Sequence, residues 1–197
     1  PSSSACAAWR ARARGPSNMP PWLDSGRLRS VELDLRSARA LHRAASHPPL
    51  LRLLAVCSRL GDGPLWFSLI LLWPLLDADV GWLGSRLVLA LGATNLLIYW
   101  SLKRSTRRLR PFDCCDDIRA CVTVPDPFSF PSGHTLHASA FALLLSAFYP
   151  ALAPLLWSFA ALVGVSRVVL GLHFPSDVLV GALIGAGTAS AVLLLVT

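Results

Sequence analysis

Long apolar segments constrain what this chain can fold into more than any other feature of its sequence. Only 15% of the residues are charged, against about 25% in average soluble domains. From residue 120 to the C-terminus there is a single arginine and no lysine, so this stretch offers no basic, wettable face to a nucleic acid. A chain of this composition needs a bilayer to cover its apolar surface, and we predict an integral membrane protein.

Five segments have the composition of membrane spans. They cover residues 64–76, 82–100, 134–149, 151–170 and 178–196. Because a backbone in lipid must satisfy its own hydrogen bonds, we expect all five to be helices. The first segment is short against the roughly 20 residues that cross a bilayer, so it needs residues from the segment before it. Gly181 and Gly185 give the last span a G-x-x-x-G face for close helix contact.

The N-terminal region is too charged to cross a bilayer. In residues 27–47, apolar side chains recur every three or four positions among Arg, Glu, Asp and Ser, the pattern of an amphipathic helix that lies on a membrane surface. Residues 50–60 form a second interfacial segment. We therefore predict an all-α fold, a polytopic transmembrane helical bundle of about five spans plus N-terminal amphipathic interfacial helices. The predicted parts are a tail at 1–26 (disordered, or an extension upstream of Met19), interfacial helices at 27–60 and a transmembrane domain at 61–197.

Three polar islands interrupt the apolar segments. They read K-R-S-T-R-R-L-R-P from Lys103 to Pro111, P-S-G-H from Pro131 to His134, and S-R-V-V-L-G-L-H-F-P-S-D from Ser166 to Asp177. The third span leaves the face where His134 lies and the fourth returns to it, so the islands meet at one membrane depth. Cations, a helix start and two imidazoles gathered in this way suit a tetrahedral anion. Each island alone has an ordinary explanation, as a positive cluster, a helix cap or a polar pair; their combination has none.

The islands resemble the signature motifs K-x6-R-P, P-S-G-H and S-R-x5-H-x3-D of the type 2 phosphatidic acid phosphatase and vanadium haloperoxidase superfamily. They match without a departure, and the resemblance covers the chain from about residue 50. It implies His173 as the nucleophile, Asp177 as the carboxylate that orients it, and His134 as general acid and then general base. It implies that the substrate phosphate is bound by Lys103, Arg110, Ser132, Gly133 and Arg167. The implied mechanism uses no metal and no cofactor.

The resemblance implies a membrane lipid phosphatase that acts on a lipid phosphate or diphosphate, such as undecaprenyl diphosphate or a phosphatidate-type lipid, through a phosphohistidine. We expect it in a bacterial inner membrane, with the lipid substrate and the bilayer as its partners, and we predict no oligomeric state. Two alternatives are a vanadium-dependent haloperoxidase-like enzyme and a non-catalytic membrane transporter or scaffold. The known haloperoxidases are larger and soluble, and the intact histidines count against a scaffold.

The sequence supports two interpretations of which side of the membrane holds the islands. Two spans precede the first island, which puts it beside the Arg-rich N-terminus, and the positive-inside rule then favours the cytoplasm. The island is basic because it must hold phosphate, however, and a cysteine cluster in the same loop favours the outer face. That cluster is Cys114, Cys115 and Cys121. A disulfide from Cys121 to one of the other two and free thiols are both compatible with the spacing.

Other polar residues receive lesser roles. We interpret His137, on the same helix face as His134, as a packing residue. Arg107 and Arg108 are interpreted as solvated surface charge. The acidic residues of the same loop, Asp113, Asp116 and Asp117, are expected to balance its charge.

Overall fold

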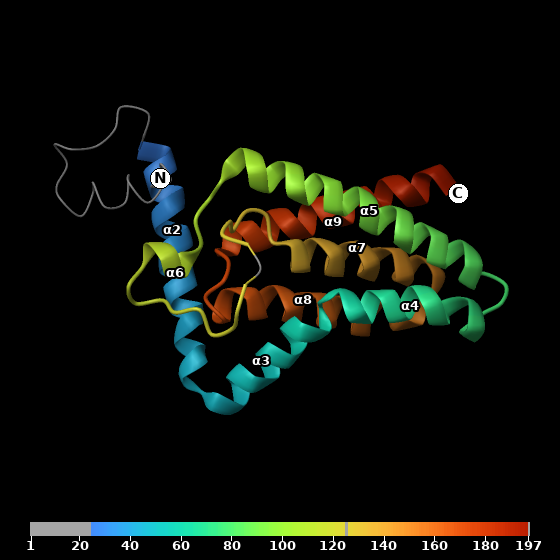
Figure 1. Ribbon diagram of the computed structural model, residues 1–197, viewed down its shortest axis with the longest axis horizontal. Coiled ribbons are helices and arrows are strands. Elements are labelled where there is room, and N and C mark those ends of the chain that lie inside the picture. The colour runs from blue at the N-terminus through green and yellow to red at the C-terminus, as the bar shows by residue number, and fades with distance from the viewer. Residues whose placement is uncertain (1–24, 125, 197) are drawn as a thin grey trace.

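The protein is a bundle of helices that run side by side, with one further helix across its end (Figure 1). The computed structural model describes residues 25–124 and 126–196. Its elements are α2 (Ser25–His42), η2 (Arg43–Ser46), α3 (Pro48–Leu60), α4 (Gly63–Leu76), α5 (Gly81–Thr106), α6 (Pro111–Cys114), α7 (Gly133–Phe148), η3 (Pro150–Leu152), α8 (Ala153–Val169) and α9 (Pro175–Val196). The predicted all-α membrane bundle is confirmed. The tail before Ser25, with Met19, lies outside the described residues.

Helix α7 is the centre of the bundle and packs mainly against α9 and α8. Its buried face contains the small residues Ala138, Ala140 and Ala142, which let the neighbouring helices approach closely. Contact with α9 is closest at two glycines. A Cβ atom on Gly181 would lie 2.6 Å from the carbonyl oxygen of Ser132, and one on Gly185 would overlap the carbonyl oxygen of Leu136. The predicted G-x-x-x-G contact face is therefore confirmed, with α7 as its partner.

Helices occupy all five predicted spans, but their lengths differ. Helices α5 and α9, and the continuous pair of η3 and α8, are long and apolar enough to cross a membrane. Helix α7 has 16 residues and rises only about 24 Å, less than the ~30 Å of a hydrocarbon core. Helices α3 and α4 reach the required length only together, as a pair bent by 50°. The short first span thus draws on the preceding segment, as its length predicted.

The hairpin of α4 and α5 is fastened at the end of the bundle that lies far from α2 (Figure 1). The indole Nε1 of Trp73, a buried residue of α4, donates to the hydroxyl of Tyr149 at 2.8 Å. That hydroxyl donates to Oδ2 of Asp77 at 2.6 Å. Gly84 of α5 leaves room for the indole, because a Cβ atom there would lie 2.5 Å from the ring. One tryptophan therefore ties α4, α5 and the end of α7 together.

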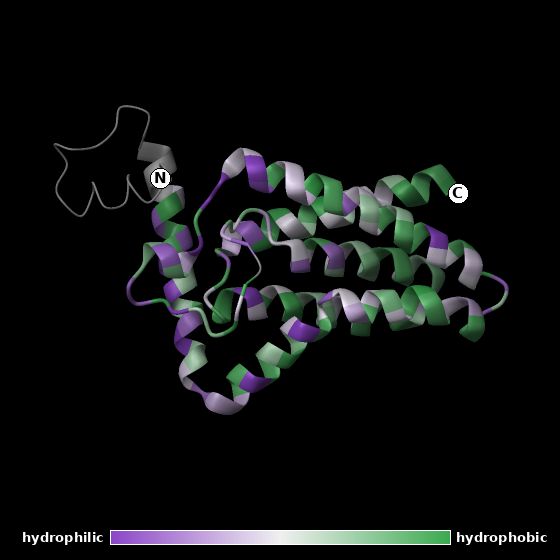
Figure 2. Cartoon of the chain, viewed as in Figure 1, coloured by the Kyte–Doolittle hydropathy of each residue, from purple (hydrophilic) through white to green (hydrophobic). Residues whose placement is uncertain are grey.

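Helix α2 crosses the other end of the bundle, and part of its apolar side is buried by protein. Leu35 and Ala38 pack with Val168 and Phe174, and Nδ1 of His42 lies 2.9 Å from the carbonyl oxygen of Val169. Figure 2 shows hydrophilic residues concentrated on α2 and at the neighbouring end of α5, whereas the long helices are mostly hydrophobic. The predicted helix of residues 27–47 is α-helical as far as His42 and continues as η2. Leu35 and Ala38 of its apolar side face the bundle end, and its position at a membrane surface stays a prediction.

The cysteine cluster contains no bridge to Cys121. This thiol is free and lies 3.8 Å from the carbonyl oxygen of Arg119. Of the two alternatives that the spacing allowed for Cys121, the structure has the free thiol.

Candidate active site

The third island turns sharply after α8 so that its histidine lies inside the bundle. Gly171 has a φ angle of 77°, a conformation that glycine adopts without strain. The backbone N–H groups of Leu172 and His173 then both donate to the carbonyl oxygen of Arg167, at 3.0 and 3.2 Å. His173 is thereby fixed against the last turn of α8, with 2% of its surface exposed.

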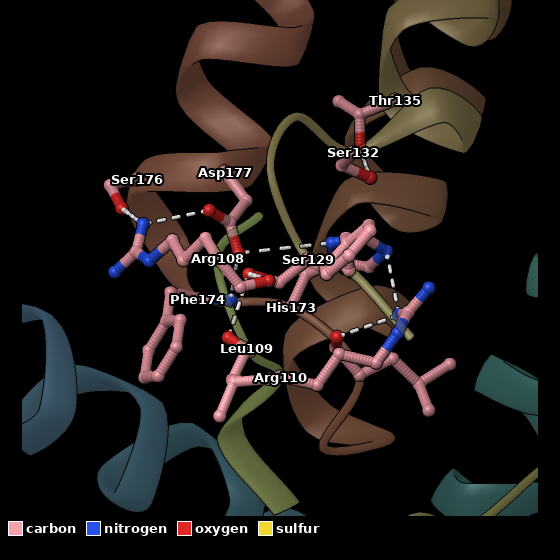
Figure 3. A network of polar contacts seen from close by, with 12 residues as sticks. Arg108, Leu109, Arg110, Ser129, Ser132, Thr135, His173, Phe174, Ser176 and Asp177 are labelled. Carbon is pink, nitrogen blue, oxygen red and sulfur yellow. Dashed lines mark hydrogen bonds and ion pairs between the residues drawn. The ribbon is translucent and has the colours of Figure 1, made fainter. Parts of the chain in front are cut away.

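Asp177 lies in the first turn of α9, on the Nδ1 side of His173 (Figure 3). Its Oδ2 accepts the backbone N–H of Phe174 at 2.8 Å and lies 3.8 Å from His173 Nδ1. That separation is longer than a hydrogen bond, and Nδ1 is buried with no hydrogen-bond partner among the described residues. The predicted pair of His173 and Asp177 therefore lies side by side, with Nδ1 and Oδ2 about 1 Å farther apart than in a hydrogen bond.

The first island brings a guanidinium to the other nitrogen of the same ring. After α5 the chain turns at Arg107, whose φ angle of 47° is in the left-handed region, and Arg110 follows at the start of α6 with 1% exposure. Nη1 of Arg110 donates to the carbonyl oxygen of Leu172 at 2.9 Å and lies 3.3 Å from His173 Nε2. Figure 3 shows Arg110 and Asp177 on opposite sides of the imidazole.

Arg167 has an unused hydrogen-bond donor. It lies in the last turn of α8 and is 4% exposed. One terminal nitrogen donates to the hydroxyl of Ser58 in α3, whereas Nε is buried and has no partner among the described residues. Buried polar groups are seldom left without a partner, so this N–H is suited to an oxygen of a bound anion.

The second island joins α7 to its neighbours at the helix start. The backbone N–H of Ser132 donates to the carbonyl oxygen of Asp177 at 3.0 Å, and its Oγ lies 3.0 Å from Oγ1 of Thr135. A Cβ atom on Gly133 would lie 2.7 Å from the ring of Tyr99. Glycine is thus required here by a neighbouring aromatic ring, a reason for this residue that the sequence did not indicate.

His134 has a carboxylate partner that the sequence analysis missed. Its Nε2 lies 2.5 Å from Oδ1 of Asp62, which is at the bend between α3 and α4. Asp62 is one acidic residue in a Gly-Asp-Gly-Pro turn, and only its position between two apolar segments set it apart. Nδ1 of His137, by contrast, lies 2.9 Å from the carbonyl oxygen of Gly133 in its own helix, which agrees with a packing role.

The electrostatic environment of His173 opposes a positive charge on its ring. Burial lowers the pKa of His173 well below its ordinary value, and the charges of Arg167, Arg110 and Lys103 lower it further, with a smaller contribution from His134. These interactions also mean that the three islands lie around one pocket. The predicted imidazoles and cations are therefore brought together at one end of the bundle.

Asp126 is a second carboxylate that the sequence analysis missed, and it lies directly on the cations. Its Oδ1 accepts from Nζ of Lys103 at 2.5 Å and from Nη2 of Arg110 at 3.2 Å. Its Oδ2 accepts from the hydroxyl of Tyr99 at 3.1 Å. Burial alone would raise the pKa of Asp126, but the hydrogen bond from Lys103 and the charges of Lys103 and Arg110 lower it overall. The carboxylate is thus held ionised beside the cations of the first island.

The structure corrects the interpretation of Arg108 as solvated surface charge. Its Nη1 donates to Oδ1 of Asp177 and to the hydroxyl of Ser176, both at 2.7 Å, and its Nη2 donates to Oδ2 of Asp34 at 2.5 Å. The guanidinium also lies 4.3 Å from the centre of the Phe174 ring. Arg108 therefore connects Asp34 of α2 to the carboxylate that faces His173. Figure 3 shows its contacts with Asp177 and Ser176.

An apolar groove of about 460 Å³ leads away from His134 between α4, α5 and α7. Its polar end is formed by Asp62, His134 and Tyr99, and its walls include Trp66 and Phe141. Further along, His137 is the one other polar residue of the lining, and the remaining lining residues are apolar. They include Phe67 and Leu89, both mostly exposed on the outer rim. The groove therefore combines an apolar channel with a polar head at the pocket.

No cluster suited to a metal ion occurs in the part of the chain that the structure describes: three or more His, Cys, Asp or Glu side chains do not gather at any point there. What the pocket offers is a neutral imidazole, a second imidazole and three cationic side chains. Such a set can bind a tetrahedral anion, attack it and move a proton.

A family model of the PAP2 superfamily matches residues 83–197, which contain all three islands. The chain belongs to the PAP2 superfamily. Among solved structures, LpxE of Aquifex aeolicus is similar with a TM-score of 0.73 and 29% identity, over 82% of this chain and 94% of that one. The transmembrane PAP2-type phosphatidylglycerolphosphate phosphatase of Bacillus subtilis gives 0.65 and 28%, over 80% and 83%.

Curated relatives of this PAP2 member match over shorter regions. The decaprenylphosphoryl-5-phosphoribose phosphatase of Mycolicibacterium smegmatis is 38% identical over 96 residues, which are 47% of this chain and 51% of that protein. The chain spans about half the length of the curated relatives it matches. The apolar helices together with the transmembrane structural neighbour make this PAP2 protein a multi-pass membrane protein.

Proposed function

We propose that this protein is a lipid phosphatase of a bacterial cell membrane, which removes phosphate from a lipid phosphate or diphosphate through a phosphohistidine. The observation that carries the proposal is the position of the pocket. His134 lies at the polar end of a groove whose walls are mostly apolar, and the charges of His134 and of the three cations act on the buried imidazole of His173. A phosphate in this pocket would leave its lipid tail in the groove, in contact with α4 and α5.

In the proposed first step, His173 Nε2 attacks phosphorus in line with the departing oxygen. A bond forms between nitrogen and phosphorus, and the bond from phosphorus to the lipid oxygen breaks. His134 donates its proton to that oxygen as general acid. Asp177 accepts a hydrogen bond from the Nδ1–H group of His173 and so stabilises the positive ring, for which the present 3.8 Å separation must shorten by about 1 Å.

In the second step, water attacks the phosphohistidine. His134 removes a proton from the water, inorganic phosphate leaves, and neutral His173 is regenerated. Through both steps Lys103, Arg110 and Arg167 neutralise the equatorial oxygens, where charge shifts in the transition state. The Nε of Arg167 is buried without a partner among the described residues. It can therefore donate to a phosphate oxygen without first breaking a hydrogen bond to the protein.

The experiment measures phosphate release from a polyprenyl phosphate, a polyprenyl diphosphate and a phosphatidate, with the purified protein in detergent. We expect His173→Ala to reduce release at least about 10³-fold on every hydrolysed substrate, because nucleophile and base act as one unit. His47→Ala is the matched control, since it removes an exposed imidazole outside the pocket. It should retain full activity.

The covalent intermediate gives a second readout. A phosphohistidine survives an alkaline quench and is lost in acid, so mass spectrometry of the alkaline-quenched protein should find phosphate on the peptide that contains residue 173. Undiminished phosphate release by His173→Ala would refute the phosphohistidine mechanism. Absence of release from all three lipids by the unmodified protein would refute the proposed activity.

A further inference from the structure

Asp126 occupies the place on the first-island cations that an anionic substrate would otherwise take. Nζ of Lys103 donates to its carboxylate and to the carbonyl oxygen of Phe128, at 2.5 and 2.6 Å. Nε of Arg110 donates to the backbone carbonyl oxygen of Asp126 at 3.0 Å, and Nη2 donates to its carboxylate. The remaining nitrogen, Nη1, is used by Leu172. Two of the three phosphate-binding cations are thus already engaged by the chain itself.

The carboxylate is held from several sides. The backbone N–H of Phe128 donates to Oδ1 at 3.0 Å, and the hydroxyl of Tyr99 donates to Oδ2. The side chain is 15% exposed, and the cations keep it ionised by lowering its pKa. The charge of Asp177, by contrast, is balanced by Arg108, whose Nη1 lies 2.7 Å from Oδ1 of Asp177. Asp126 therefore removes one unit of positive charge from the phosphoryl pocket.

We infer that Asp126 is a specificity-determining residue that makes the pocket select lipid phosphomonoesters over lipid diphosphates. The inference rests on the proposed function and narrows its substrate class. If the carboxylate stays in place, it repels the substrate, and a diphosphate has the larger negative charge. If it is displaced, the substrate must compete for Lys103 and Arg110. A diphosphate then needs cations for two phosphoryl groups, whereas Lys103 and Arg110 are both already in contact with Asp126.

The test compares Asp126→Asn with Asp116→Asn. Asp116 is exposed in the loop that follows the first island, so both variants lose one negative charge and only one of them changes the pocket. For each protein, kcat/KM is measured on a monoester and a diphosphate with the same tail, together with the inhibition constant of inorganic phosphate. We expect Asp126→Asn to lower the inhibition constant roughly three- to tenfold and to raise the diphosphate-to-monoester ratio of kcat/KM by a similar factor. Asp116→Asn should change neither.

Two outcomes would overturn the inference. An Asp126→Asn protein that binds inorganic phosphate more weakly, with equal losses of kcat/KM on both substrates, would make Asp126 a residue that positions Lys103 and Arg110. An unchanged ratio and inhibition constant would remove it from substrate selection altogether. The thermal unfolding midpoint of each variant is measured without anion and with inorganic phosphate or vanadate at concentrations that rise in 10-fold steps. It reports anion binding independently of turnover. If the unmodified protein hydrolyses no lipid, the proposed function fails, and the rank order of anion protection still decides the role of Asp126.

Discussion

His173 is a neutral base held among positive charges. Its ring is buried, Arg110 contacts Nε2, and Arg167 and Lys103 add to the field that disfavours a second proton. A neutral imidazole is the form that can attack phosphorus. The same cations that would bind the phosphate thus also keep the proposed nucleophile deprotonated.

The pH dependence of kcat/KM follows from this lowered pKa. Because the pKa of His173 in the folded protein is well below 6.5, its neutral form is fully present above pH 6.5 and is lost only as the pH falls through the lowered value. We expect the acid limb of a profile of kcat/KM against pH to lie below pH 6.5. An acid limb centred at or above 6.5 would exclude His173 as the neutral group it reports. The same shift makes folding stability decrease as pH falls below 6.5, since only the unfolded chain then takes up the proton.

Motif residues, Asp177 among them, could be predicted from the sequence, whereas the two carboxylates that lie outside the motifs could not. Lys103, Arg110, His134 and His173 have fixed spacings within short segments, and the order of the spans brings those segments together. Asp62 and Asp126 lie in turns, where no periodicity assigns a side chain to a pocket. Their roles depend on how α3 bends into α4 and on how the loop before α7 folds back, and both are tertiary contacts.

At the scale of helices, the contact of α7 with α9 depends on the absence of side chains at two positions of α9. Gly185→Ala is expected to destabilise the protein by about 1–3 kcal/mol, because the new methyl group would overlap the carbonyl oxygen of Leu136 and separate the helices. The control is Gly187→Ala, since a Cβ atom there meets nothing within 4 Å. It should be neutral, or stabilising by up to about 1 kcal/mol through helix propensity. Equal shifts of the thermal unfolding midpoint in the two variants would contradict this account.

Helix positions were predictable because apolar composition and proline define their ends. Pro48 begins α3, and the predicted spans agree with α4, α5 and α9 within a few residues at most ends. The sequence did not indicate the central place of α7 or the 50° bend between α3 and α4. Helix α7 is short and rich in alanine, and its burial depends on neighbours that surround it from three sides.

At the scale of the whole molecule, α2 is connected to Asp177, the carboxylate of the proposed active site. Asp34 is 9% exposed. It accepts from Arg108, from the backbone N–H of Ser176 at 2.9 Å and from the hydroxyl of Ser176. These contacts hold the first turn of α9, where Asp177 lies. A helix that precedes the region matched by the family model therefore supports the proposed active site.

Asp34→Asn should lower kcat roughly tenfold and reduce stability by up to about 3 kcal/mol, since it leaves the partly buried Arg108 without one of its carboxylates. Asp117→Asn is the control. Arg39 lies in the same helix as Asp34 and forms an exposed ion pair with Asp117 at 2.7 Å. The variant removes this ion pair and should lower the free energy of unfolding by at most about 1 kcal/mol. Phosphate release and thermal unfolding measure the two effects. If both variants behave alike, α2 does not act through Arg108.

The hydrogen bonds of Trp73, at the far end of the α4–α5 hairpin, have a consequence for which part of a lipid the protein would contact. Trp73 holds that end of the hairpin together, whereas the side chains of Phe67 and Leu89 are exposed along the flank of the groove. From Asp62 to Ile70 the helix rises about 12 Å, so only the first stretch of a tail would touch protein and the remainder would trail sideways among neighbouring lipids. If the groove holds the tail as proposed, hydrolysis should depend on the headgroup and on the first part of the tail, and it should not depend on the total number of carbons.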